Sequence, residues 1–188
     1  MMPEQLRTRL ASLSVQPPPL EKEDQHAAVL VALLPEQPGC PVVLTRRAAK
    51  MRHHAGEISL PGGLLDPGDN YDVVQAALRE AHEELGLSPA AVAVHSVLPP
   101  LQNSRGLHVF PVLGTLDKRP RWRPQPAEVS EILEVPLSFF LSEDHYLPRH
   151  RYYRGTLRDT LVMEYEDGTI WGLTARIMRS VSQFLQQP

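Results

Sequence analysis

Cysteine is nearly absent from this sequence, in which Cys40 is the one cysteine among 188 residues. A single thiol cannot form an internal disulfide, and it cannot build a metal site that needs several thiolates. The sequence therefore excludes a disulfide-stapled scaffold and a cysteine-based zinc site. Cys40 stands between Gly39 and Pro41, a setting typical of a loop.

Long apolar runs and a basic excess are also missing. No apolar run approaches the roughly 20 residues that a membrane-spanning helix needs. Residues 1–13 lack the basic and then apolar pattern of a secretion signal. The formal net charge is −3, whereas a general nucleic-acid-binding protein would carry a strong positive excess. We therefore expect a cytoplasmic protein that acts on a small molecule and binds neither nucleic acid nor a membrane.

Proline is abundant, with 19 residues, about twice its ordinary share. The prolines are spread along the chain, which predicts stiff connections between short elements. A chain of this length suits one domain. Residues 4–13 predict a short amphipathic helix and residues 16–24 an extended linker. We divide the chain into an N-terminal helix and Pro-rich arm, 1–25, which is either a packing helix or a homodimer contact, and a single domain, 26–188.

The stretch from Pro61 to Leu87 carries most of the chemistry. It opens with a Pro-Gly-Gly turn and ends in a predicted helix. Asp72 is its predicted N-cap, with Gln75 completing a capping box, and Gly86 is its predicted stop. Apolar residues recur at helical spacing and so share one face: Val74, Ala77, Leu78, Ala81 and Leu85.

Three glutamates lie on this predicted helix beside its apolar face. Glu80 and Glu84 are one turn apart, and Glu83 follows Glu80 by three residues. Like charges at this spacing destabilise a helix by roughly 0.2–0.5 kcal/mol per pair. Clustered carboxylate oxygens are the ligands that Mg²⁺ or Mn²⁺ prefers. Taken alone, the glutamates fit a metal site and a solvated acidic face equally well.

The wider pattern resembles the box that defines the Nudix hydrolase family. Residues 79–87, REAHEELGL, are similar to its R-E-U-x-E-E-x-G-U end, in which U is aliphatic, and Pro61-Gly62-Gly63 is similar to its glycine start. The usual box is G-x5-E-x7-R-E. Here Asp69 occupies the first acidic place, and nine residues rather than seven separate it from Arg79. The resemblance therefore assigns no role to Asp69.

The residues before the box resemble one subfamily. Residues 44–48, LTRRA, and 52–63, RHHAGEISLPGG, are similar to the L-T-x-R-S-x3-R-x-H-x-G-x3-F-P-G-G motif of Nudix hydrolases of the coenzyme A diphosphatase type. Members of that group also have a lengthened box. Ala48 and Leu60 replace the usual Ser and Phe, and the IWGLTA run at 170–175 is similar to the same group. The resemblance covers roughly residues 26–186.

The family resemblance implies a metal site and catalytic residues. Mg²⁺ or Mn²⁺ is expected on three carboxylates and one backbone carbonyl, those of Glu80, Glu83, Glu84 and Gly62. Arg79 is expected to orient the glutamates. Related hydrolases often take a general base or a further metal ligand from a loop after the third or fourth strand, where Glu128 is the candidate base. The alternative is that Glu128, Glu131 and Glu134 are solvated acids.

A basic cluster precedes the box, made up of Arg46, Arg47, Lys50 and Arg52 with His53 and His54. Isolated arginines would fit a solvated loop. Their place ahead of an acidic helix instead favours phosphate binding, since Arg pairs with phosphate oxygens through two hydrogen bonds. The motif positions select Arg47, Arg52 and His54 as substrate-binding residues.

A second basic segment, residues 118–126 with Trp122, is interpreted as an irregular connection. The alternative is an edge of the adenine or pantetheine site, where Trp122 or an arginine would stack on the ligand.

Strand patterns dominate the rest of the chain. We expect strands at 27–34, 41–47, 57–60, 91–98, 108–116, 129–134, 146–154, 161–165 and 169–171, and a helix at 173–185. The first two strands are expected to form one hairpin, and 146–154 with 161–165 a last hairpin. These elements suit a mixed α/β fold. The Nudix resemblance implies an α/β/α sandwich around a mixed β-sheet.

The reaction implied by the resemblance is metal-dependent hydrolysis of coenzyme A, or its acyl or oxidised forms, to 3′,5′-ADP and 4′-phosphopantetheine. One alternative is a Nudix diphosphatase acting on ADP-ribose, NADH or another nucleoside diphosphate derivative, which needs no Arg–His–Gly motif upstream. The other is a non-catalytic module that binds a nucleotide-linked metabolite and regulates another process. The presence of all three glutamates disfavours that module.

Overall fold

The computed structural model describes residues 4–16, 20, 26–153 and 155–187. The helices are α1 (Glu4–Ala11), α2 (Val73–Leu85), α3 (Leu137–Leu141) and α4 (Gly172–Gln186). The strands are β1 (His26–Leu33), β2 (Val42–Arg47), β3 (Ile58–Ser59), β4 (Gly62–Leu64), β5 (Val92–Val97), β6 (Leu101–Gln102), β7 (His108–Leu116), β8 (Val129–Val135), β9 (Leu147–Tyr153), β10 (Thr156–Tyr165) and β11 (Gly168–Trp171).

Strand β1 lies at the centre of an eight-stranded mixed sheet with the path β3-β2-β1-β7-β5. It runs parallel to β7 from His26–His108 to Leu33–Thr115. The other pairs in this sheet are antiparallel, including those of β4 with β1, β6 with β7 and β8 with β2. Seven of the eight β1 residues are buried, as its continuous apolar sequence predicts for a strand covered on both faces.

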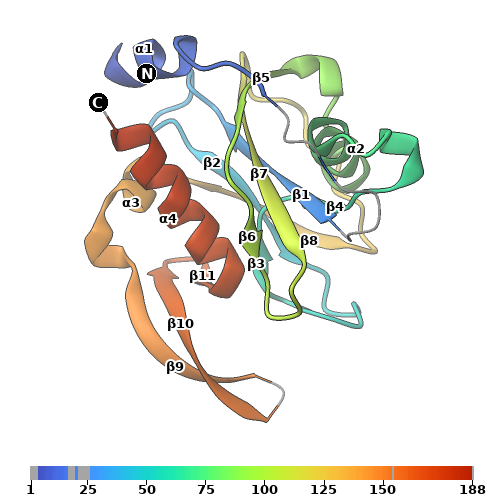
Figure 1. The fold of residues 1–188 in the computed structure, drawn as a ribbon, viewed down its shortest axis with the longest axis vertical. Coiled ribbons are helices and arrows are strands. Elements are labelled where there is room, and N and C mark those ends of the chain that lie inside the picture. Colours follow the sequence, from blue (N-terminus) through green and yellow to red (C-terminus); the bar gives the residue numbers. More distant parts are fainter. Residues whose placement is uncertain (1–3, 17–19, 21–25, 154, 188) are drawn as a thin grey trace.

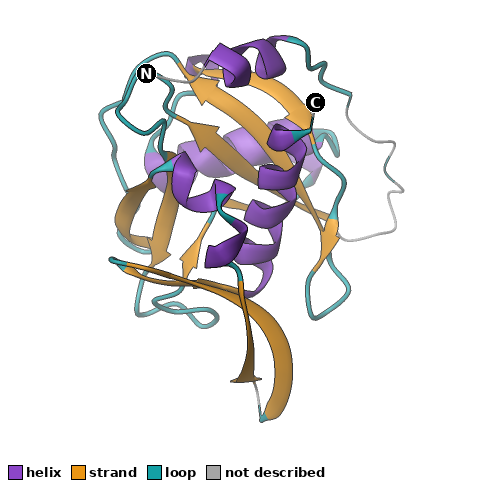
Figure 2. Ribbon diagram, turned by 90° about the vertical axis from the view of Figure 1, so that its left-hand side faces the viewer, coloured by secondary structure: helices purple, strands orange, loops and turns teal. Residues whose placement is uncertain are grey.

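Helices cover both faces of this sheet, as Figures 1 and 2 show. Alternate β1 side chains divide between two cores. Ala28 and Leu30 pack with α2, while Val31 and Leu33 pack in the core that contains α4. The expected fold class, an α/β/α sandwich around a mixed sheet, is confirmed.

The predicted last hairpin of 146–154 with 161–165 is confirmed, since β9 and β10 pair antiparallel. Together with β11 they form a separate three-stranded sheet in the order β11-β10-β9, and this separation from the main sheet was not expected. The β9–β10 hairpin projects away from the main sheet at the lower end of Figure 1. Strand β10 begins at Thr156, earlier than the predicted 161–165, because Thr156 to Leu161 pair with β9. Its outer residues are exposed, so no alternation of apolar side chains marks them in the sequence.

The predicted hairpin of the first two strands is only partly correct. Strands β1 and β2 share one register pair, Leu33 with Val42. At its other end, the same edge of β1 pairs with β4. Strand β2 therefore pairs along most of its length with β8. Several short features were also missed, namely β4, β6, α3 and the 3₁₀ turns at Pro67–Asp69, Pro89–Ala91 and Glu143–His145.

Helix α1 packs onto the domain through Leu6 and Leu10, which are buried in the same core as α4. The Arg9 guanidinium also lies 5.0 Å from the centre of the Phe184 ring. These contacts support the packing-helix interpretation of α1, while the homodimer stays a prediction. Most of the predicted linker lies outside the described residues. Within the ranges given above, no helix has the length and apolar character to cross a membrane.

Helix α2 has its predicted N-cap, Asp72, and its predicted stop, Gly86, but its cap contacts do not include the Gln75 side-chain bond that a capping box requires. Asp72 accepts hydrogen bonds from the backbone N–H groups of Val74, at 2.7 Å, and Gln75, at 3.3 Å. Gly86, with φ of +66°, donates to the Ala81 and His82 carbonyls and closes the helix. The buried face is rotated from the predicted one. It contains Glu84 together with Val73, Ala76, Ala77, Ala81 and Leu85.

We predict that Asp72→Ala lowers the free energy of unfolding by about 1 kcal/mol, because two N–H groups at the start of α2 lose their acceptor. Urea denaturation at neutral pH measures this change. Asp72→Asn is the matched control, since its side-chain oxygen still caps, and it should retain most of the stability. Equal stability of the Ala variant and the unmodified protein would contradict the capping role.

Candidate active site

Two glycines bring strand β4 against helix α2. A Cβ atom on Gly63 would lie 2.4 Å from Glu80 Oε1, and one on Gly62 would lie 2.3 Å from the Ala28 carbonyl oxygen. Both distances are well inside van der Waals contact, so any larger residue would displace the strand or the glutamate. The Pro-Gly-Gly turn is therefore a requirement for close approach of backbone and carboxylate.

Glu84 is the most buried of the helix glutamates, with 3% of its surface exposed. Burial, together with the nearby Glu80 and Glu128 carboxylates, raises the pKa of Glu84 to about 8, against the lowering effects of Arg47 and a Gly62 hydrogen bond. Its Oε2 atom is buried without a hydrogen-bond partner in the described part of the chain. A buried carboxylate oxygen of this kind is stabilised when it binds a cation or a proton.

Glu80 lies one turn before Glu84, against Gly63. Burial raises the pKa of Glu80, and the Glu83 and Glu128 carboxylates also raise it, while Arg79 lowers it. The four carboxylates thus share one electrostatic environment. This places Glu128, immediately before β8, near the helix glutamates. Its backbone carbonyl accepts a hydrogen bond from Ala48 N–H at 2.8 Å.

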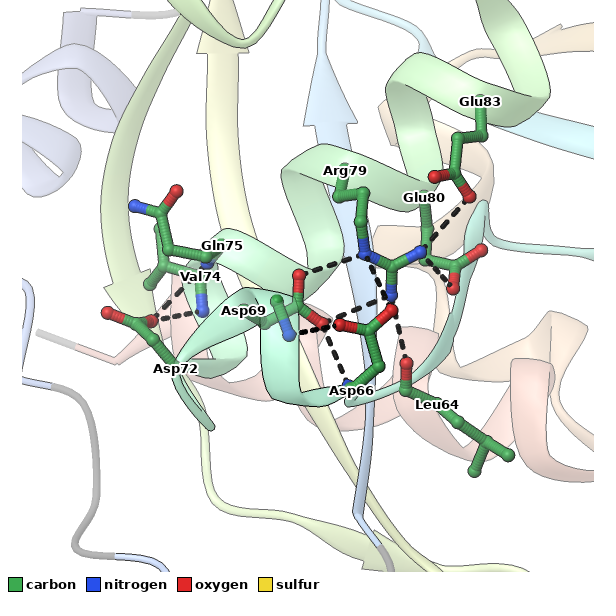
Figure 3. Close-up of polar contacts among 10 residues, drawn as sticks. Leu64, Asp66, Asp69, Asp72, Val74, Gln75, Arg79, Glu80 and Glu83 are labelled. Atoms are coloured by element: carbon green, nitrogen blue, oxygen red, sulfur yellow. Dashed lines mark hydrogen bonds and ion pairs between the residues drawn. The ribbon is translucent and has the colours of Figure 1, made fainter.

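Arg79 ties the acidic residues of α2 to the preceding turn, as Figure 3 shows. Its guanidinium lies 2.9 Å from Glu80 Oε1 and 3.0 Å from Glu83 Oε2. It also donates to the Leu64 carbonyl at 3.0 Å. These contacts support the expected positioning role and leave Arg79 directed at protein groups.

Asp69, to which the resemblance assigned no role, is the buried partner of Arg79. Arg79 Nε donates to Asp69 Oδ1 at 2.8 Å and Nη2 to Oδ2 at 3.1 Å. Burial alone would raise the pKa of Asp69, but the hydrogen bonds from Arg79 and from the Asp66 backbone bring it below its usual value. The 3₁₀ turn Pro67–Asp69 presents this carboxylate to Arg79 despite the longer spacing in sequence.

Several features of this cluster fit a divalent cation. Its donors are hard carboxylate oxygens, one of them buried and unpartnered, and the glycine turn leaves room at the backbone. As they stand, no three acidic, His or Cys side chains of the described residues are gathered tightly enough to coordinate one ion. The physical reason is that Glu80 and Glu83 are turned toward Arg79. Glu80 and Glu83 would both have to turn away from Arg79 to share an ion with Glu84. The expected ligand set of Glu80, Glu83, Glu84 and the Gly62 carbonyl therefore stays a prediction.

A cavity of about 860 Å³ opens on the other side of β4, next to this cluster. Its floor is formed by sheet residues such as Ala27, Val29 and Val109. Its walls come from the residues preceding β4, from the β6–β7 turn, and from β10 and the start of α4. The volume suits a nucleotide-sized ligand.

Arg47 connects the cavity to the acidic cluster. It lines the cavity, and its charge lowers the pKa of Glu84. Its Nε atom is buried without a hydrogen-bond partner among the described residues. An N–H group of this kind can be satisfied by a ligand oxygen.

Two of the three predicted substrate-binding residues line the cavity, Arg47 and His54, and His54 Nδ1 lies 2.9 Å from Glu57 Oε2. The third, Arg52, is exposed on the loop between β2 and β3 and is not among the lining residues. The loop turns back after Arg47, where the Gly56 N–H donates to the Arg47 carbonyl at 3.1 Å. This leaves Arg52 at its outer end.

The basic segment 118–126 is an irregular connection, as interpreted, and none of its residues lines the cavity. The Arg123 and Gln125 N–H groups donate to the Leu85 and Glu84 carbonyls, at 2.8 and 2.9 Å. They satisfy carbonyls at the end of α2 that lack partners within the helix. Trp122 donates to Glu134 at 2.8 Å and packs against the α2 core, so stacking on a cavity ligand is not supported.

Sequence reasoning missed several residues of the cavity wall: Arg105, Arg158, Thr160, Trp171 and Arg176. Arg158 and Thr160 alternate along β10, but that part of β10 was read as loop. Arg176 lies on α4 beside the predicted apolar face. The signal that was available is the IWGLTA run, whose Trp171, Gly172, Leu173 and Thr174 do line the cavity.

Comparisons with known proteins identify relatives over most of the chain. The family model described as NUDIX domain matches residues 24–155. The chain is 40% identical to an uncharacterized Nudix hydrolase, NudL, of Photorhabdus laumondii over 178 residues, 93% of each protein. It is also 40% identical to the NudL of Salmonella paratyphi B over 159 residues, which cover 84% of this chain and 81% of the relative.

Solved structures agree with these matches. A Nudix hydrolase from M. smegmatis, RenU, superimposes with a TM-score of 0.51 and 27% identity, covering 60% of this chain and 71% of that protein. A MutT/nudix family protein from Enterococcus faecalis has a TM-score of 0.52 at 16% identity, covering 92% and 66%, and supports the fold alone. This chain therefore belongs to the Nudix hydrolase family and is a hydrolase of nucleoside diphosphate derivatives.

Proposed function

We propose that this hydrolase cleaves the diphosphate of coenzyme A and its derivatives, yielding 3′,5′-ADP and 4′-phosphopantetheine or its acylated form. One observation carries the proposal. The cavity is lined by four arginines, and the charge of one of them, Arg47, also lowers the pKa of Glu84 on the acidic helix. Coenzyme A is a nucleotide with a diphosphate and a further phosphate, so it matches a cavity with this charge. The similarity of residues 44–63 to the coenzyme A motif supports the same choice.

In the proposed reaction, Arg47 holds the diphosphate between the cavity and the acidic helix. Glu80, Glu84, Glu83 and the Gly62 carbonyl hold the Mg²⁺ or Mn²⁺ on which Nudix hydrolases depend. When bound, that cation neutralises phosphate oxygens and makes water more acidic. Glu128 accepts the proton of the attacking water. Arg79, fixed by Asp69, keeps Glu80 and Glu83 in place, and Arg47 and His54 position the substrate.

We predict that the purified protein with Mg²⁺ or Mn²⁺ releases 3′,5′-ADP from coenzyme A, and that Glu84→Gln lowers kcat about 100-fold or more, because a neutral amide is a poor ligand for a hard cation. Mass-resolved product analysis measures both results. Glu143→Gln is the matched control, since Glu143 pairs with Arg179 away from the cavity.

Faster cleavage of ADP-ribose or NADH would reject the substrate assignment and keep the Nudix chemistry. Binding of one of these compounds without turnover would favour the regulatory module.

We predict that Glu128→Gln lowers kcat by about 10²- to 10⁴-fold with little change in KM, because the variant cannot accept a proton. Titration with Mn²⁺, followed by electron paramagnetic resonance, should give the same affinity as the unmodified protein. A large loss of Mn²⁺ affinity would make Glu128 a metal ligand rather than the base.

We predict that protein freed of metal with EDTA loses stability from pH 5 to pH 8 through Glu84. The pKa of Glu84 is raised to about 8 in the folded state, so between those pH values the unfolded chain ionises this group and the folded protein does not. The contribution of protonated Glu84 to the free energy of unfolding is thus present at low pH and lost as pH rises. The decrease in melting temperature between pH 5 and pH 8 should be about 5 °C larger in the unmodified protein than in Glu84→Gln. This difference corresponds to a contribution of about 2 kcal/mol from Glu84 to the free energy of unfolding.

Addition of Mn²⁺ at pH 8 should restore stability to the unmodified protein and have little effect on Glu84→Gln. Parallel pH curves for the two EDTA-treated proteins would show that Glu84 is not the buried titrating group.

A further inference from the structure

The cavity concentrates positive charge in a chain whose formal net charge is −3. Four arginines line it, and its single acidic lining residue, Glu57, lies within 2.9 Å of His54. The lining arginines are Arg47, Arg105, Arg158 and Arg176. A diphosphate held at Arg47, beside the acidic helix, does not account for the three arginines on the far walls.

These three arginines differ from many others in the molecule by having no acidic partner. Arg7, Arg46, Arg79, Arg119 and Arg179 each form an ion pair with a carboxylate. Within the described residues, no such pair involves Arg105, Arg158 or Arg176. Positive charge gathered around one cavity without internal neutralisation favours an anionic ligand.

Arg158 and Arg176 occupy neighbouring walls. Arg158 lies two residues before Thr160 on β10, so both side chains are on the same face of the strand, and both line the cavity. Thr160 Oγ1 would lie 3.9 Å from a Cβ atom on Gly172, the first residue of α4. Arg176 is one turn further along α4. Strand β10 and helix α4 lie side by side in Figures 1 and 2.

Arg176 is held in place by the sheet as well as by its helix. Its Nη1 donates to the Gln102 carbonyl of β6 at 3.1 Å, which leaves its other donors available. Arg105, in contrast, is exposed in the turn at residues 103–106 between β6 and β7. It adds charge to the rim without a fixed position.

We propose that Arg158 and Arg176 form a subsite for a phosphomonoester on the nucleoside half of the substrate, which in coenzyme A is the 3′-phosphate. The inference rests on the proposed function for the identity of that substrate. Arg47 binds the scissile diphosphate, and the two arginines on β10 and α4 bind the second phosphate across the cavity. The subsite makes the enzyme prefer substrates that carry this phosphate over those that lack it.

Binding of two nucleotides tests the subsite without any hydrolysis. Calorimetry would compare 3′,5′-ADP with 5′-AMP, which lacks only the 3′-phosphate, on the unmodified protein and on Arg158→Ala and Arg176→Ala. We expect the unmodified protein to prefer 3′,5′-ADP by about 10-fold or more, as charge-assisted hydrogen bonds to a phosphate predict. Each variant should bind 3′,5′-ADP and 5′-AMP with nearly equal affinity, and its affinity for 5′-AMP should equal that of the unmodified protein. Arg179→Ala, three residues further along α4 and paired with Glu143, should keep the full preference.

Equal affinity of the unmodified protein for the two nucleotides would overturn the subsite. The subsite would also be overturned if the variants kept the preference for 3′,5′-ADP, or if they bound both nucleotides more weakly by the same factor. Hydrolysis of coenzyme A and of dephospho-coenzyme A separates this inference from the proposed function. Turnover of coenzyme A without any nucleotide preference rejects the subsite alone. A preference that depends on both arginines, without turnover of either substrate, rejects the coenzyme A assignment and keeps the subsite.

Discussion

The contact between the glycine backbone of β4 and the carboxylates of α2 is the constraint on which this site depends. Glu80 reaches Gly63 only because that residue has no Cβ atom, and Glu84 lies in the buried face of α2. Burying two carboxylates side by side is unfavourable unless a cation or a proton compensates them. Arg79, with Asp69 behind it, compensates Glu80 and Glu83 but not Glu84. Ligand binding is thus coupled to the stability of this helix.

Local chemistry made the acidic helix of the candidate site predictable from sequence. The Asp72 cap, the Gly86 stop and the spacing of the glutamates are all read within one short segment, and the structure places each as expected. The exact buried face was less predictable. The apolar pattern excluded Glu84, whereas β4 and the segment before β8 bury it through contacts distant in sequence. The role of Asp69 was also missed. The 3₁₀ turn that ends at Asp69 brings its carboxylate to Arg79 in spite of the longer spacing in sequence.

The cavity wall could not be predicted because its residues lack a local signal. Arg158 lies on the exposed end of β10, and Arg176 is one of two arginines on the amphipathic helix α4, where nothing in the sequence distinguishes it from Arg179. Only the folding of β10 against α4 brings them to one cavity. Arg52 does not line the cavity because its loop turns outward, which a motif position does not show, and its role in substrate binding stays a prediction. Residues 24–155, which match the family model, contain the acidic helix, whereas Arg158, Thr160 and Arg176 lie beyond them.

Strand β10 combines two roles along its length. Its inner residues, Val162 and Met163, are buried in the main core, while its outer residues near Arg158 are exposed and belong to the projecting hairpin. Replacement of Arg158 would therefore alter one wall of the cavity without repacking the interior. This separation makes the outer part of β10 a natural place for engineering, where the cavity wall can be changed while the buried part of the same strand is left as it is.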